Sequence, residues 1–297
     1  MKTVVLAVFL SVMTACVHGQ DHSWVKIKTD YGMGRKIDTI HFYISDGYNS
    51  KTIHSTADEN GVYLVEFDIA NPIDILWGFS KKDALPLIIS PNDTIHITIL
   101  SEKDGILFGK RARTCANLME MYEFPNRPPA QVYESEYKND PGEFVGYMND
   151  RLNSHLKFVN NFCKSTKCTK TFVTWYLKSA YVSYYRNLAD YCHSLQRRAM
   201  QDHSAYNDFL RGREVILKNI DLNDPTLEMS SGYYDLLKSV FSLYVTPQEL
   251  RSIYRKDMSK AMRNSVDSFV FDRLNEISDD ETRKVIIAYY KGLKTRI

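Results

Sequence analysis

The feature that most constrains this chain is a change in hydrophobic period near residue 110. Between Trp24 and Phe108, apolar and polar residues alternate in short segments separated by turn residues, a pattern typical of half-buried β-strands. Beyond that point apolar residues recur every three or four positions, a pattern typical of helices packed on one face. The sequence therefore predicts an α+β protein, with an N-terminal antiparallel β-sandwich over residues 22–110 and an all-α helical domain over residues 111–297.

The clearest strands are bounded by turn sequences. Residues 58–61 end in Asn-Gly, which readily accepts positive φ, and residues 90–93 form a second turn, Ser-Pro-Asn-Asp. After that second turn, Ile95, Ile97 and Ile99 share one face of a half-buried strand. About seven short strands are expected, and the clearest cover residues 37–44, 62–68, 73–79, 85–89 and 94–99.

The helices are predicted from caps and breaks as well as from period. Asp140 before Pro141 marks the start of one helix, and Thr169 marks the start of a longer one. The longer helix is apolar around most of its circumference over residues 172–185, so it should be central and buried. Predicted helices cover residues 113–123, 141–162, 170–200 and 230–244, with further helices starting after Thr246 and Ser278.

The first twenty residues have the composition of an export signal. Lys2 is followed by an almost wholly apolar run over residues 4–13, too short to span a bilayer but suited to a signal-peptide core. Two processing sites compete: a lipobox-like sequence ending at Cys16, which would be lipidated, and ordinary cleavage after Gly19. We therefore expect a signal peptide over residues 1–19 and an exported protein, either periplasmic or anchored to the membrane only through an N-terminal lipid.

The cysteines suit an oxidising compartment. Without Cys16, four remain, which allow two disulfides in three connectivities. Cys163 and Cys168 flank a turn-like segment and could close a small loop, whereas Cys115 and Cys192 could tie the start of the helical region to its long central helix. Structural disulfides or buried thiols are preferred over redox chemistry, because the spacing is not Cys-x-x-Cys, and over zinc, because no second pair lies nearby in sequence.

No other motif predicts chemistry. The sequence has no phosphate-binding glycine loop and no nucleophile elbow, so we assign no catalytic, cofactor-binding or metal-binding residue. The formal net charge is only +2, and the pair Arg197 and Arg198 is too small for a nucleic-acid patch. His41, His54 and His96 fall in strand patterns and are expected to be solvated or paired across a sheet.

Three features together resemble one family. The exported start, the strand-turn-strand segment over residues 87–97 and the segment over residues 221–227 before an aromatic helix are similar to the N-terminal half of envelope thiol-disulfide oxidoreductases of the TlpA/ResA-like class. The resemblance covers residues 24–290 and implies a β-sandwich, a helical region and then a thioredoxin domain. Asn92 stands where the family usually has glycine, a tolerable change because asparagine also accepts left-handed dihedral angles.

The same resemblance carries no redox residue across. No Cys-x-x-Cys occurs in the sequence, and the chain ends at Ile297, where the thioredoxin domain would begin. We therefore expect an envelope protein that acts as a non-catalytic binding or scaffold module, with a protein partner. The alternatives are an accessory partner of a thioredoxin-like oxidoreductase and a truncated member of that family. The expected contact surface is the junction between the two domains, where grooves commonly form.

Overall fold

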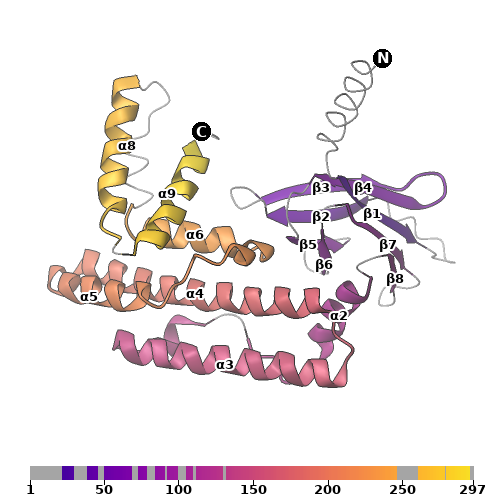
Figure 1. The fold of residues 1–297 in the computed structure, drawn as a ribbon, viewed down its shortest axis with the longest axis horizontal. Helices are drawn as coiled ribbons and strands as arrows, with labels where there is room; N and C mark the ends of the chain where they lie inside the picture. Colours follow the sequence, from indigo (N-terminus) through magenta and orange to yellow (C-terminus); the bar gives the residue numbers. More distant parts are fainter. Residues whose placement is uncertain are drawn as a thin grey trace, which may run out of the picture.

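Figure 1 shows the fold as a computed structural model, with the strands at one end and the helices stacked beside them. It describes residues 22–29, 39–45, 50–68, 73–78, 84–90, 92–99, 105–109, 112–129, 132–245, 260–277 and 279–294. The predicted signal peptide over residues 1–19, its Cys16 and the helix start at Thr246 lie outside the described residues. Within the described part, no helix has both the length and the apolar character needed to cross a membrane.

The strands form two four-stranded sheets within the described residues. One sheet has the order β4-β1-β7-β8 and the other β3-β2-β5-β6. The predicted strands over residues 62–68, 85–89 and 94–99 are confirmed with those bounds. The strands are β1 (His22–Thr29), β2 (Thr39–Ser45), β3 (Ser50–Thr56), β4 (Val62–Asp68), β5 (Ile73–Gly78), β6 (Leu85–Ile89), β7 (Thr94–Ile99) and β8 (Gly105–Gly109).

The expectation of a purely antiparallel strand region is wrong at one ladder. Strands β1 and β7 pair in parallel, with Val25 opposite Ile95 and Ile27 opposite Ile97. The other described ladders are antiparallel. Parallel neighbours cannot be joined by a tight hairpin, and here most of the strand region lies between β1 and β7 in sequence. Alternation alone does not reveal the direction of a neighbouring strand.

Both sheets contribute to one hydrophobic core. Tyr63, Val65 and Phe67 alternate inward on β4, and Ile95 and Ile97 do so on β7, as predicted for that strand. The predicted turns have the expected backbone: Gly61 has φ 73° and Asn92 has φ 59°. The core of the strand region comprises Ile40, Phe42, Tyr63, Val65, Phe67, Ile75, Trp77, Leu87, Ile89, Ile95, Ile97 and Cys115.

The helical region is layered around α4 (Figure 1). Helix α4 packs against α2, α3, α5 and α6, which confirms that the longest predicted helix is central. The helices are α2 (Ala112–Glu123), η1 (Glu134–Glu136), α3 (Pro141–Ser165), α4 (Lys170–Gln201), η2 (His203–Ala205), α5 (Tyr206–Leu217), η3 (Pro225–Met229), α6 (Tyr233–Ser242), α8 (Lys260–Leu274) and α9 (Asp280–Lys294). On α6 the side chains that face the core, among them Leu236, Leu237 and Val240, are buried.

Local capping explains where these helices begin. The Asp140 carboxylate accepts hydrogen bonds from the backbone N–H groups of Gly142 and Glu143, so it satisfies donors that the first turn of α3 leaves free. The Thr169 hydroxyl accepts from the backbone N–H of Phe172 at the start of α4. The Asp279 carboxylate accepts from the N–H of Thr282 at 2.7 Å before α9. These starts were predicted from the sequence and are confirmed.

The junction between strands and helices is filled by packed side chains. Ile88 of β6 is fully buried among side chains of α2, α3 and α4, including Leu118, Phe162 and Trp175. Beside it, Asp74 of β5 accepts hydrogen bonds from the N–H of Ser231 at 2.6 Å and from its hydroxyl at 3.2 Å. The strands therefore hold the end of α4 that carries its first residues, and the other end of α4 lies away from both sheets (Figure 1).

Candidate functional site

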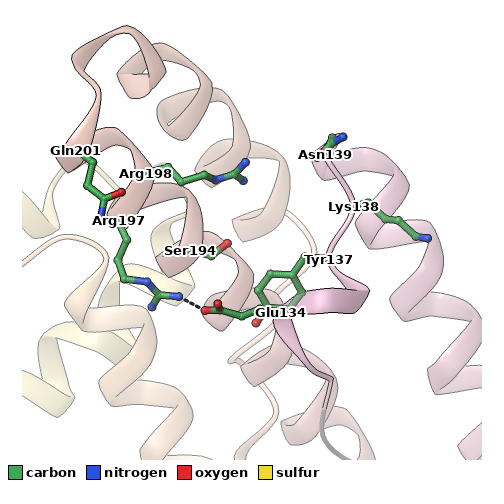
Figure 2. A pocket seen from close by; sticks show the side chains of 8 residues that line it. All are labelled: Glu134, Tyr137, Lys138, Asn139, Ser194, Arg197, Arg198 and Gln201. Atoms are coloured by element: carbon green, nitrogen blue, oxygen red, sulfur yellow. Dashed lines mark hydrogen bonds and ion pairs between the residues drawn. The ribbon is translucent and has the colours of Figure 1, made fainter.

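A polar cavity of about 330 Å³ lies between η1 and the last turns of α4. One wall comes from the segment that starts at Glu134, and the other comes from α4, more than fifty residues later in the chain. Figure 2 shows the side chains around the hollow, with Tyr137 opposite Arg197 and Ser194 between them. The lining residues are Glu134, Tyr137, Lys138, Asn139, Ser194, Arg197, Arg198 and Gln201.

The η1 wall is held in place by partly buried hydrogen bonds. Tyr147 of α3 donates its hydroxyl proton to Glu136 Oε1 at 2.5 Å, and Arg151 donates to the same oxygen at 3.3 Å. The hydroxyl of Tyr191 on α4 donates to the carbonyl oxygen of Lys138 at 2.9 Å. The two walls of the cavity are therefore connected directly, and their spacing is set by packed aromatic side chains.

Tyr137 forms the aromatic side of the cavity. Its ring lies edge-to-face against Phe144 at 5.2 Å and against Tyr191 at 5.3 Å, measured between ring centroids. Burial, followed by the nearby charges of Asp190 and Glu134, raises the pKa of the Tyr137 hydroxyl to about 12. The hydroxyl is therefore a neutral hydrogen-bond donor at physiological pH.

Cations outnumber carboxylates around this cavity. Its lining has Lys138, Arg197 and Arg198 against Glu134 alone. The Arg197 guanidinium is bonded to the Glu134 carboxylate across the hollow, as the dashed line in Figure 2 shows. Both side chains are more than half exposed, so this ion pair is weak and can be opened by a competing anion.

The two remaining cations differ in direction. The Lys138 ammonium lies over the Tyr147 ring, 5.5 Å from its centroid, so it is directed toward α3. Arg198 extends toward Asn139 at the rim in Figure 2. Arg198 and Asn139 also line a second cavity of about 120 Å³, beside Pro141, Phe209 and Arg211. Arg198 therefore stands between two adjacent hollows.

The chemistry available here is recognition of an anion. Guanidinium groups make bidentate hydrogen bonds with carboxylates and phosphates, and the side-chain amides of Asn139 and Gln201 add neutral donors. The lining contains no cysteine or histidine. Among the residues that the structure describes, no group of three or more histidine, cysteine or acidic side chains is placed to hold a metal ion.

Sequence reasoning missed this cavity. The adjacent pair Arg197 and Arg198 was visible, but it was considered only as a nucleic-acid patch and was too small for one. The opposite wall is a short 3₁₀ turn, and neither its position nor its partner on α4 follows from local pattern. The junction between the regions, expected as the contact surface, is instead filled by the Ile88 cluster described above.

The structure separates the four predicted disulfide cysteines into one pair and two thiols. Cys163 and Cys168 form a disulfide across the turn between α3 and α4, with 5.2 Å between their Cα atoms. The predicted pairing of Cys115 with Cys192 is wrong, because neither residue forms a disulfide and both are buried. Cys115 packs into the core of the strand region and lies 3.8 Å from the carbonyl oxygen of Ile88, whereas Cys192 packs into the helical core.

These two buried thiols are unsuited to redox chemistry. Burial raises the pKa of the Cys192 thiol to about 12, so its reactive thiolate is scarce. Cys115 is fully buried. His41 and His54 lie in strands, as expected, and face each other across β2 and β3.

Comparison with known proteins found no relative of this chain. No family model, no curated protein and no solved structure matches this chain.

Proposed function

We propose that this chain is a non-catalytic binding protein of the cell envelope that holds a small anionic ligand in the cavity between η1 and α4. The observation that carries the proposal is the set of side chains around that cavity: Arg197 and Arg198, neutral donors from Asn139 and Gln201, and the apolar ring of Tyr137. A carboxylate or phosphate fits the donors, and an attached apolar group fits the ring.

An anionic ligand is expected to bind by displacing the Glu134 carboxylate from Arg197. In the structure, the Glu134 carboxylate is paired with Arg197. An incoming anion would take over Arg197 and would also engage Arg198, which gives it one more charge-assisted hydrogen-bond partner than Glu134 has here. Binding should therefore weaken with salt, because the groups involved are exposed.

The test is titration of the disulfide-intact protein with inorganic phosphate and, separately, with citrate, at low ionic strength. Isothermal titration calorimetry and backbone amide shifts should locate binding at Ser194 and Asn139. The variant Arg198→Gln should bind at least about tenfold more weakly, since a hydrogen bond to a charged group contributes about 1.5–3 kcal/mol.

The matched control is Arg186→Gln on the same helix. Arg186 is exposed, donates to Asp235 at 3.2 Å and does not line the cavity, so its replacement should leave binding unchanged. Shifts scattered over the surface, or equal losses in both arginine variants, would rule out a specific site. If neither phosphate nor citrate bound, the proposal would also be wrong.

The location of the protein rests on its first twenty residues. The apolar run over residues 4–13 and the lipobox-like sequence before Cys16 support export, with or without a lipid anchor. Mass spectrometry of the mature protein from its own cells distinguishes an acylated Cys16 from a chain starting at Gln20. Intact leader on protein from the cytosol would contradict export.

For the strand region we propose a β-sandwich. Its support is one hydrophobic core shared by two four-stranded sheets, as in the family that the sequence resembles. That resemblance to the TlpA/ResA-like class stays a proposal, and a profile built from newly found homologues would test it.

The alternative function, as an accessory of a thioredoxin-like oxidoreductase, has one observation in its favour. The disulfide between Cys163 and Cys168 sits at a surface turn and is partly exposed, so a thiolate from another protein could attack it. Measuring the reduction potential of this disulfide tests the alternative. A value well below about −300 mV is typical of a structural disulfide and would exclude this role.

A further inference from the structure

A second site lies on the strand region, far in sequence from the cavity. His41 of β2 and His54 of β3 are directly opposite each other in the antiparallel ladder. Their Nδ1 atoms are 2.7 Å apart, and their ring centroids are 4.8 Å apart with the rings nearly perpendicular. The pair is exposed to solvent.

The backbone explains why both rings stand on the same outer face. The neighbours of His41 on β2, Ile40 and Phe42, are both fully buried in the core of the strand region, so His41 points the other way. On β3 the next residue, Ser55, is buried, and His54 is exposed. Directly opposite residues have Cβ atoms only about 5 Å apart, which brings the two rings within reach of one small ligand.

The two nitrogen atoms are disposed as neighbouring ligands of one metal ion. Imidazole nitrogen binds Zn²⁺ at about 2.0–2.1 Å, so two such ligands on one ion are separated by roughly 3 Å. The observed 2.7 Å needs only a small opening of the exposed His54 side chain and the half-buried His41 side chain. The Tyr43 ring, 6.2 Å from the His41 ring and stacked on it, restricts the orientation of that imidazole.

We propose that His41 and His54 bind a divalent transition-metal ion, of the class of Zn²⁺, Cu²⁺ and Ni²⁺, through their Nδ1 atoms. Imidazole is a preferred ligand of these ions and is a poor one for Mg²⁺ and Ca²⁺. The described residues supply two ligands at this face, and the ion would take its further ligands from solvent or from another donor. An open site of this kind suits recruitment of a metal or of a metal-linked partner, independent of the anion cavity.

The test is titration of the full mature chain with ZnCl₂ and with CuCl₂, followed by calorimetry and, for Cu²⁺, electron paramagnetic resonance. The variants are His41→Gln and His54→Gln, which keep a polar side chain at an exposed position. Each should weaken metal binding by at least about tenfold, because one of two protein ligands is lost. Hyperfine coupling to two imidazole nitrogens should fall to coupling to one.

The matched control is His96→Gln. His96 is also an exposed strand histidine, but it lies on β7, in the other sheet. Its replacement should leave affinity and spectrum unchanged, and circular dichroism should show that all three variants fold. Equal loss in the His96 variant, undiminished binding in the His41 and His54 variants, or no binding at micromolar metal would overturn the proposal.

Discussion

The strand region and the helical region bury their side chains in different ways. The core of the strand region consists of aliphatic and phenyl side chains, apart from Tyr63, Trp77 and Cys115. The helical core instead contains Tyr184, Tyr191, Tyr233, Tyr244, Tyr289 and Tyr290. The hydrophobic stabilisation from buried aliphatic side chains does not depend on their orientation. A buried tyrosine, in contrast, also needs a hydrogen-bond partner for its hydroxyl group.

Those partners connect segments that are distant in sequence. The hydroxyl of Tyr184 donates to Asn149 at 2.8 Å, that of Tyr191 to the Lys138 carbonyl oxygen at 2.9 Å, and that of Tyr290 to Asp267 at 2.9 Å. Hydrogen bonds from buried tyrosines in the helical core therefore position the polar segment that lines the cavity. The strand region supplies a scaffold, and its outer face carries the histidine pair.

The largest expected effect separates stability from binding. Phe144→Ala and Phe42→Ala each remove a fully buried ring, one from the helical core and one from the strand core, and each should cost about 3–5 kcal/mol of unfolding free energy. Only Phe144→Ala should also weaken anion binding, because Phe144 stacks on Tyr191 at 4.2 Å and contacts Tyr137. Urea denaturation and anion titration measure the two effects. If Phe42→Ala weakened anion binding as much as Phe144→Ala does, the helical core would have no special role in shaping the cavity.

The next effect tests the covalent constraint in the helical region. The disulfide between Cys163 and Cys168 closes a loop with a sequence separation of only 5. By loop-closure entropy, replacing both cysteines by serine should cost about 2 kcal/mol in thermal or urea unfolding. Ser165→Ala, at an exposed position in the same turn, is the control and should change stability by less than about 0.5 kcal/mol. An unchanged double variant would mean that the disulfide does not restrict the unfolded chain.

A smaller effect isolates one directional bond. Tyr191→Phe keeps the buried ring but removes the donor to the Lys138 carbonyl oxygen, so it should cost about 0.5–1.5 kcal/mol. It should also loosen the Lys138 and Asn139 segment, visible as faster amide hydrogen exchange there. Tyr206→Phe serves as control, since Tyr206 is 51% exposed and its change should be close to neutral. Equal effects in both variants would show that the buried hydroxyl bond contributes nothing specific.

The smallest effect concerns pH at the junction of the two regions. Burial raises the pKa of Asp74 above its ordinary value of 3.8, and hydrogen bonds from Ser231 oppose this only in part. Between 3.8 and that higher pKa, the folded protein holds more proton than the unfolded chain, so the unfolding free energy falls as pH rises through this window.

The comparison variant is Asp74→Asn, which cannot titrate. The unfolding free energy of the unmodified protein, minus that of the variant, should decrease as pH is raised from about 4 toward neutrality. Urea denaturation at a series of pH values measures this difference. A difference that increases with pH would mean that the Ser231 hydrogen bonds outweigh burial.

The sequence by itself determined the order of strands and helices and most of their boundaries. Turns at Gly61 and Asn92 and caps at Asp140, Thr169 and Asp279 act between residues a few positions apart, so their physics is visible in local sequence. The close cysteine pair was predicted for the same reason.

Only the tertiary structure decided which distant segments meet. It set the parallel pairing of β1 with β7, the separation of Cys115 from Cys192, and the meeting of η1 with the last turns of α4 that forms the cavity. It also placed His41 against His54, although both were recognisable as strand residues. Such contacts depend on how the buried faces of whole strands and helices fit together. The period of the apolar residues predicts which face of an element is buried, but it does not predict which other element packs against that face.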